Sequence, residues 1–195
     1  DPLPAGAHVR IAALLLLAAL GGGSAWGAQE PSPELRRALQ RAQRCLQEGR
    51  AEQGLKVLRA FRRAHPAERC WLLEFLWGNL CWKLGRREEA LRAWQAATRL
   101  NPRDGRSWQN LARAYSEAGR HLEAARAFER AARLNGDREL RLYAAVAYLE
   151  AGRPREALVR LRALVGKVRG APERWLLVLL RAQLAAHDLR GAEEV

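Results

Sequence analysis

The sequence predicts an all-α protein, a solenoid of antiparallel helix pairs. Three observations support this fold class: the residue composition, a 34-residue period, and turn residues at the ends of each period. Val, Ile and Thr, the types that favour strands, together number only ten of 195 residues. Ala, Leu, Arg and Glu, which favour helices, dominate instead. A hydrophobic share of 49% excludes a disordered chain despite a formal net charge of +13.

The first 28 residues have the pattern of a secretory signal peptide. Arg10 precedes an apolar run over residues 11–20, and small residues follow at Ala25 and Gly27. Ten helical residues rise only about 15 Å, half of a bilayer core, so the run is too short to span a membrane. We expect cleavage near Gly27 or Ala28 and a periplasmic or secreted mature protein; a short buried helix is the alternative. Residues 29–34 are expected to be a linker.

Residues 34 apart match in type along the rest of the chain, for example Gly85 with Gly119 and Trp94 with Phe128. The period predicts about four and a half helix pairs in an array over residues 35–195. The expected units lie near residues 35–68, 71–104, 105–137, 138–172 and 173–195, the last one incomplete and ending inside its second helix. Because Met is absent even at position 1 and no polar capping helix closes the array, the sequence is interpreted as part of a longer chain.

The residues inside each period explain why helices would pair. Small residues such as Gly78 and Ala112 let two helices approach to about 8–10 Å, and Trp94 and its counterparts fill the remaining space. Gly85 and Gly119 fall where the first helix of a pair should end in a left-handed cap. Further turn and first-turn signals stand at Asn101-Pro102, Asn135-Gly136 and Pro154.

This pattern resembles the tetratricopeptide repeat (TPR), most closely from Trp108 through Ala131, and the resemblance covers roughly residues 34–195. It implies a non-catalytic fold whose first helices line a concave groove for peptides or partner proteins. The family's groove places carry over to Phe75, Asn79, Trp82, Lys83, Gln109, Asn110, Arg113, Leu142, Val146 and Leu149. A partner with apolar anchors and some acidic character would suit this mixture. The alternative for Phe75 and Trp82 is packing within the array.

The positive charge is almost entirely arginine, 31 Arg against 3 Lys, and is spread along the array. The densest cluster lies on the first helix, beginning with Arg36 and Arg37. An acidic partner, anionic lipid or nucleic acid could each meet such a surface. Because no dense basic block or nucleic-acid motif is present, we favour solvated helix faces, no nucleic-acid partner, and membrane association only through partners or surface charge.

The sequence predicts no catalytic residue, metal site or cofactor. Cys45, Cys70 and Cys81 contain no Cys-x-x-Cys pair and are expected to be buried free thiols, with Cys70 the most exposed. The histidines outside residues 1–28 are widely spaced, without a nearby ligand at metal-binding distance along the chain.

We therefore expect an exported, non-enzymatic TPR adaptor that assembles partners in a bacterial cell envelope. One alternative is a docking or regulatory segment of a longer envelope enzyme or exporter. Another rests on a weaker resemblance, carried by residues 106–115, 152–157 and 166–168, to TPR proteins that accompany TonB-type systems.

Overall fold

The computed structural model describes residues 31–166 and 170–193, and side chains as far as residue 186. Every regular element in this part of the chain is an α-helix, as predicted. The chain divides into two compact units, Asp1–Asn101 and Pro102–Val195. The expected signal peptide, residues 1–28, lies outside the described residues.

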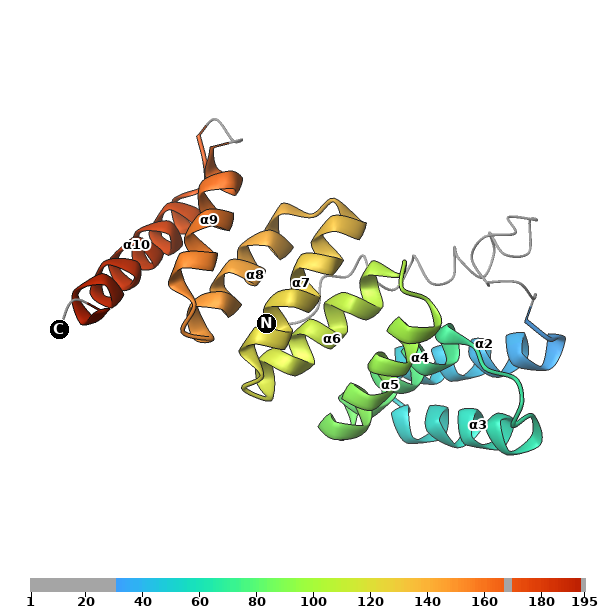
Figure 1. Cartoon of the computed structure of the whole chain (residues 1–195). Helices are drawn as coiled ribbons and strands as arrows, with labels where there is room; N and C mark the ends of the chain where they lie inside the picture. Colours follow the sequence, from blue (N-terminus) through green and yellow to red (C-terminus); the bar gives the residue numbers. More distant parts are fainter. Residues whose placement is uncertain (1–30, 167–169, 194–195) are drawn as a thin grey trace. The chain divides into compact units, whose positions relative to one another are not determined.

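The first unit contains two antiparallel helix pairs. Helices α2 (Pro33–Gln47) and α3 (Ala51–Ala64) form the first pair, and α4 (Trp71–Lys83) and α5 (Arg87–Leu100) form the second (Figure 1). Helix α4 contacts α2, α3 and α5. Apolar side chains lie around most of the circumference of α4, and this central place buries most of them.

The second unit continues the same order of elements. It contains the pairs α6 (Gly105–Glu117) with α7 (His121–Asn135) and α8 (Arg138–Glu150) with α9 (Pro154–Val165), followed by α10 (Glu173–Glu193). Each of the four complete units predicted from the period therefore holds one helix pair. Helix α8 packs against α7 and α9, and α10 packs against α9.

The predicted glycine caps are confirmed. Gly85 and Gly119 adopt left-handed backbone conformations, with φ of 72° and 70°. The N–H of the residue after each glycine donates back to the helix that has just ended, from Arg86 to the carbonyl oxygen of Cys81 and from Arg120 to that of Tyr115, both at 2.9 Å. A residue with a side chain would be strained in this conformation, which explains why glycine recurs at this place in both units.

Two element boundaries differ from the expectation. Helix α2 begins at Pro33, inside the expected linker 29–34, because the Ser32 hydroxyl accepts a hydrogen bond from the N–H of Leu35 at 3.0 Å and Pro33 suits the first helical turn. The incomplete fifth unit was expected to turn into a second helix, but Glu173–Glu193 is one continuous helix. The reason is that His187, not a glycine, stands where the other pairs have their turn glycine, and Ala185 and Ala186 just before it favour helix.

The close approach predicted at Gly78 is also confirmed. A Cβ added to Gly78 would lie 2.5 Å from Nε1 of Trp94, so the indole of α5 occupies the space that the glycine of α4 leaves open. Trp94 is only 3% exposed.

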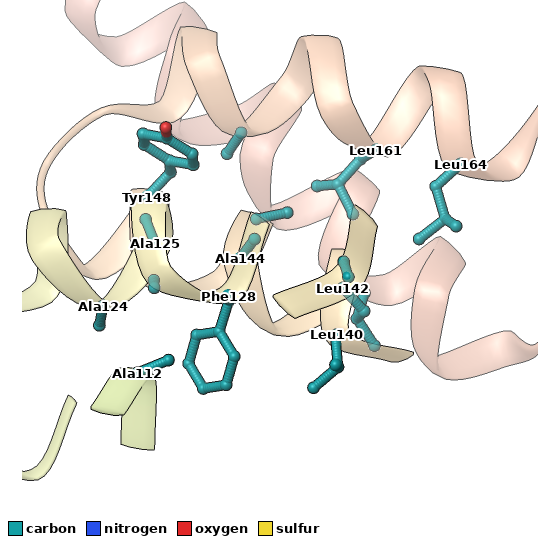
Figure 2. Packing of buried hydrophobic residues seen from close by; sticks show 14 of the residues in the cluster. Ala112, Ala124, Ala125, Phe128, Leu140, Leu142, Ala144, Tyr148, Leu161 and Leu164 are labelled. Atoms are coloured by element: carbon teal, nitrogen blue, oxygen red, sulfur yellow. The ribbon is translucent and has the colours of Figure 1, made fainter. Parts of the chain in front are cut away.

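The second unit has one hydrophobic core cluster, in which alanines of α7 and α8 alternate with larger side chains (Figure 2). Phe128, Leu140, Tyr148 and Leu161 are the larger members that fill the space between helices α7, α8 and α9. Alanines bring the helices close together, and the larger residues complete the packing. Within the described ranges, no helix has both the length and the apolar character needed to cross a membrane.

The N-terminus of α6 depends on Asp104, and its removal tests this cap. One Asp104 carboxylate oxygen accepts hydrogen bonds from both the N–H and the hydroxyl of buried Ser107, at 2.9 and 2.6 Å. We expect Asp104→Ala to lower the free energy of unfolding by about 1–2 kcal/mol, because the helix loses its cap. Asp104→Asn, which keeps an acceptor oxygen, should cost much less. Denaturant unfolding followed by circular dichroism measures both; equal losses in the two variants would contradict the capping role.

The three cysteines are free thiols with different environments. Cys81 is buried, whereas Cys45 and Cys70 are partly exposed, so the expectation of buried thiols was wrong for Cys45. Burial raises the pKa of the Cys81 thiol to about 11 and also raises that of Cys70.

Alkylation tests this difference. At pH 8 only about a thousandth of a thiol with a pKa near 11 is ionised, and the thiolate is the form that reacts. We expect iodoacetamide to modify Cys45 much faster than Cys81 in the folded protein. In about 6–8 M urea, which unfolds the protein, both cysteines should react at similar rates. Peptide mass spectrometry reads out each site; similar rates in the folded protein would show that Cys81 is accessible.

Candidate functional site

The candidate binding residues lie on the first helices of three pairs. Those on α4 belong to the first unit, and those on α6 and α8 belong to the second. The structure separates them by exposure: some are enclosed by the fold and others remain available to a partner.

In the first unit, most candidates on α4 serve the fold. Phe75 is only 4% exposed, and its ring centroid lies 6.5 Å from that of Trp71. Trp82 packs between the Trp94 ring, at 5.3 Å between centroids, and the Arg87 guanidinium, 3.9 Å from the ring.

Asn79 also takes part in the contact between α4 and α5. Its side-chain oxygen accepts a hydrogen bond from Nε1 of Trp94 at 3.2 Å. Lys83, at the end of α4, is exposed and has no ion pair among the described residues. Of the four candidates in this unit, Lys83 is therefore the most accessible to a partner.

In the second unit, the candidates on α6 lie nearer the surface. Arg113 is exposed and has no ion pair with any residue that the structure describes, while Gln109 and Asn110 are half-buried. Gln109 and Arg113 stand four residues apart, so they share one face of α6.

The candidates on α8 divide between core and surface. Leu142 is 5% exposed and belongs to the core cluster (Figure 2). Val146 and Leu149 are half-buried and lie three residues apart on α8, where they keep some apolar surface accessible. Leu149 also packs against the core cluster, as do Trp108 and Tyr115 of α6.

An arginine–glutamate ion pair is repeated at the start of three second helices. After Gly85, Gly119 and Gly152 an arginine pairs with a glutamate three residues later: Arg86 with Glu89 at 2.6 Å, Arg120 with Glu123 at 2.8 Å and Arg153 with Glu156 at 3.0 Å. The hydrogen bond from its arginine lowers the pKa of each of the three glutamates. The repeated Gly-Arg-x-x-Glu spacing is visible in the sequence, although the sequence analysis did not use it. Since these pairs are exposed, each stabilises the fold by 1 kcal/mol at most.

A polar residue that the sequence analysis missed is Gln43. It follows Ala42 on α2 just as Asn79 follows Gly78 on α4, so the alignment of the two units could have identified it. Gln43 is 6% exposed, and neither atom of its side-chain amide has a hydrogen-bond partner among the described residues. A buried amide without partners lowers stability.

Replacing Gln43 tests that cost. We expect Gln43→Met, which keeps the length of the side chain and removes the amide, to raise the free energy of unfolding by about 1–2 kcal/mol. Gln40→Met, on an exposed part of α2, is the matched control and should change stability by less than about 0.5 kcal/mol. Chemical denaturation measures both, and a loss of stability in Gln43→Met would show that the amide is satisfied.

No group of three or more His, Cys, Asp or Glu residues within residues 31–166 and 170–193 could hold a metal ion. The described part of the candidate site is instead composed of cationic, amide and aliphatic side chains, which suit non-covalent recognition of a polypeptide.

Comparison with known proteins agrees with this architecture. Two family models described as tetratricopeptide repeat match the chain, over residues 75–139 and 115–184. No curated protein matches it.

Solved structures match at low sequence identity. A fragment of MamA from Desulfovibrio magneticus RS-1, residue 41 to the end, is 16% identical, with a TM-score of 0.64 over 84% of this chain and 91% of that fragment. A kinesin light chain protein of Podosopora anserina with nearly identical TPR-like repeats is 20% identical, with a TM-score of 0.58 over 85% of this chain and 93% of that one. Such identities show the fold alone. Together with the two family matches, they establish that the chain belongs to the tetratricopeptide repeat family, whose arrays are protein–protein interaction scaffolds.

Proposed function

We propose that this protein is an exported adaptor that holds a peptide or a partner protein against the first helices of its repeats. The observation that carries the proposal is Arg113 on α6, an exposed cation that no described residue neutralises. Gln109 on the same face can supply hydrogen bonds, and Val146 and Leu149 on α8 offer apolar contacts. An acidic segment with aliphatic side chains would be complementary to this surface.

The buried candidates have a different part in the proposal. Phe75 in the first unit and Leu142 in the second each pack inside their own unit, so they leave little area for direct contact with a partner. Trp82 and Asn79 hold α5 against α4. In the first unit, Lys83 is the corresponding exposed cation that forms no ion pair with a described residue.

The proposed setting is a cell-envelope assembly on the outer side of the bacterial inner membrane. Support comes from the basic, apolar and small-residue pattern of residues 1–28. Intact-mass analysis of the protein recovered from its own host tests this part: a mature N-terminus near Ala28 is expected, and a cell-associated form that retains residues 1–28 would contradict export.

Site-specific photocrosslinking tests the binding surface. A photoreactive amino acid placed at Ser116, an exposed residue three positions after Arg113 on α6, leaves Arg113 intact and should crosslink one discrete protein in an envelope extract. The same probe at Arg126, an exposed arginine of α7, is the matched control and should not give that product. Charge reversal is the second part of the test. Arg113→Glu should reduce recovery of the crosslinked protein at least tenfold, which corresponds to about 1.4 kcal/mol of binding free energy. Arg126→Glu should leave the recovery unchanged.

The outcomes are distinct. Crosslinking of the same protein with equal yield from both positions would indicate nonspecific charge attraction. Specific crosslinking from Arg126 alone would place the partner on the second helices and overturn the proposed surface. Unchanged recovery with Arg113→Glu would show that this cation does not contribute.

A further inference from the structure

A second site lies in the second unit, on different helices from the candidate surface of α6. A pocket of about 400 Å³ is formed by α7, α8 and α9. Its lining residues are Glu129, Ala132, Arg133, Arg141, Ala144, Arg160, Ala163 and Leu164. Ala132, Ala144 and Ala163 each come from a different one of these helices, and their small side chains leave the space open. We refer to it as the arginine pocket.

One of its three arginines is fixed in place and neutralised. Arg160 forms an ion pair with Glu129 across the pocket. Its guanidinium lies 4.1 Å from the Tyr148 ring and donates hydrogen bonds to the Tyr148 hydroxyl, at 3.2 Å, and to the backbone oxygen of Glu156, at 2.9 Å. Burial raises the pKa of Tyr148, so this hydroxyl stays neutral at physiological pH. Arg160 therefore forms a preorganised wall of the pocket.

The other two arginines keep an uncompensated charge. Arg133 of α7 and Arg141 of α8 are exposed and form no ion pair with any described residue. With Glu129 already paired to Arg160, the pocket has two positive charges and no remaining carboxylate to balance them. Arginine forks bind carboxylates through two parallel hydrogen bonds, so a pair of them around a concave space favours an anionic group.

The remaining lining indicates which kind of anion fits. Three alanines and Leu164 make much of the wall apolar, a poor environment for a fully hydrated inorganic ion. A volume of about 400 Å³ can hold an acidic side chain together with a neighbouring aliphatic one. We propose that the arginine pocket binds an acidic peptide segment of a partner protein, with an Asp or Glu carboxylate at Arg133 and Arg141 and an adjacent aliphatic residue against Leu164.

The arginine pocket and the surface around Arg113 share α8 but use different residues of it: Arg141 and Ala144 line the pocket, whereas Val146 and Leu149 belong to the surface. The two sites would let one chain hold two partners, or two segments of one partner.

Peptide titration of the full chain tests the proposal. The probes are a set of labelled five-residue peptides that each contain an Asp or Glu beside a Leu or Val, together with matched peptides in which the acid is Asn or Gln. Fluorescence anisotropy measures binding, and NMR shifts of Arg133, Arg141 and Leu164 locate it. We expect at least one acidic peptide to bind and its amide counterpart to bind at least tenfold more weakly.

Three variants separate the pocket from general charge attraction. Arg133→Ser with Arg141→Ser should weaken binding at least tenfold. Arg126→Ser with Arg162→Ser removes the same charge from exposed positions of α7 and α9 that do not line the pocket, and should leave binding within twofold. Ala163→Phe keeps the charge, fills the space from an exposed position, and should also weaken binding. Circular dichroism confirms that each variant is folded.

Four results would overturn the proposal. They are no binding by any acidic peptide, equal weakening by the two double arginine variants, unchanged binding in Ala163→Phe, or binding of inorganic phosphate without binding of any peptide. Loss of partner crosslinking from α6 would not affect this titration, so the two sites are tested separately.

Discussion

Replacing Trp94 with alanine is expected to lower the free energy of unfolding by about 3–5 kcal/mol, the loss typical of deleting a buried aromatic side chain. Trp94 is 3% exposed and fills the space beside Gly78, where α4 and α5 approach each other. Its ring also packs on Trp82, and its Nε1–H donates to Asn79. Alanine would remove all three contacts and leave a cavity that the rigid backbone around Gly78 cannot close.

Trp94→Phe is the matched control because it keeps an aromatic ring and removes only the hydrogen bond and part of the volume. It should cost about 1–2 kcal/mol, less than half of the alanine effect. Far-ultraviolet circular dichroism is the suitable probe, since both variants change the tryptophan fluorescence. Helical arrays can unfold in more than one step. The denaturation curves are therefore fitted with a multi-step unfolding model, and the total free energy of unfolding is compared between the variants. A loss below about 1 kcal/mol in Trp94→Ala would show that the ring does not support the helix pair.

The helix pairs were predictable because their determinants are local. A small residue, an aromatic residue and a glycine recur 34 residues apart, and the structure places Gly85 and Gly119 in the left-handed conformation that this spacing requires. The same reasoning explains the failure in the last unit. The expected turn near residue 187 depended on the period alone, whereas that position is His187 instead of glycine and Ala185 and Ala186 favour continued helix, so α10 continues through them.

The candidate site was less predictable, because a repeat template gives a residue's place on its helix but not the contacts of its side chain. Trp82 stands at a place that Ser116 holds in the next unit. Its large ring reaches Trp94 and is covered by Arg87, contacts that serine cannot make. The repeat template gives Arg113 an accessible place on α6. The structure shows this side chain exposed, with no ion pair among the described residues.

The arginine pocket could not be predicted from the sequence either. Ala132, Ala144 and Ala163 look like ordinary helix residues in the sequence, and they define a space only when three helices bring them together. The free charge of Arg133 and Arg141 likewise becomes apparent only after Glu129 is seen to pair with Arg160. Net charge along the sequence could not separate these two arginines from the paired ones.

Replacing Leu161 with alanine is the second large expected effect, a loss of about 2–5 kcal/mol in the free energy of unfolding. Leu161 is completely buried and belongs to the core cluster with Tyr148 and Leu164 (Figure 2). Helix α9 contacts both α8 and α10, so a cavity at its centre weakens the packing of three helices. The many alanines of the cluster make the loss larger, because they have no rotamers that could shift to fill the space.

Val159 supplies the matched control on the same helix. It lies two residues away and is 66% exposed, so Val159→Ala removes apolar atoms from α9 without opening a cavity and should change stability by less than about 0.5 kcal/mol. Both variants also exchange a larger aliphatic residue for alanine, which is the better helix former, and the gain is greater over valine than over leucine. The difference in helix propensity is at most about 0.7 kcal/mol, so it cannot explain a gap of about 2 kcal/mol. Denaturation followed by circular dichroism compares the pair directly. Equal changes in the free energy of unfolding would mean that the side chain of Leu161 does not hold α9 in place. A difference of about 2 kcal/mol or more between the two variants identifies the contacts of Leu161 as what holds α9 against its neighbours.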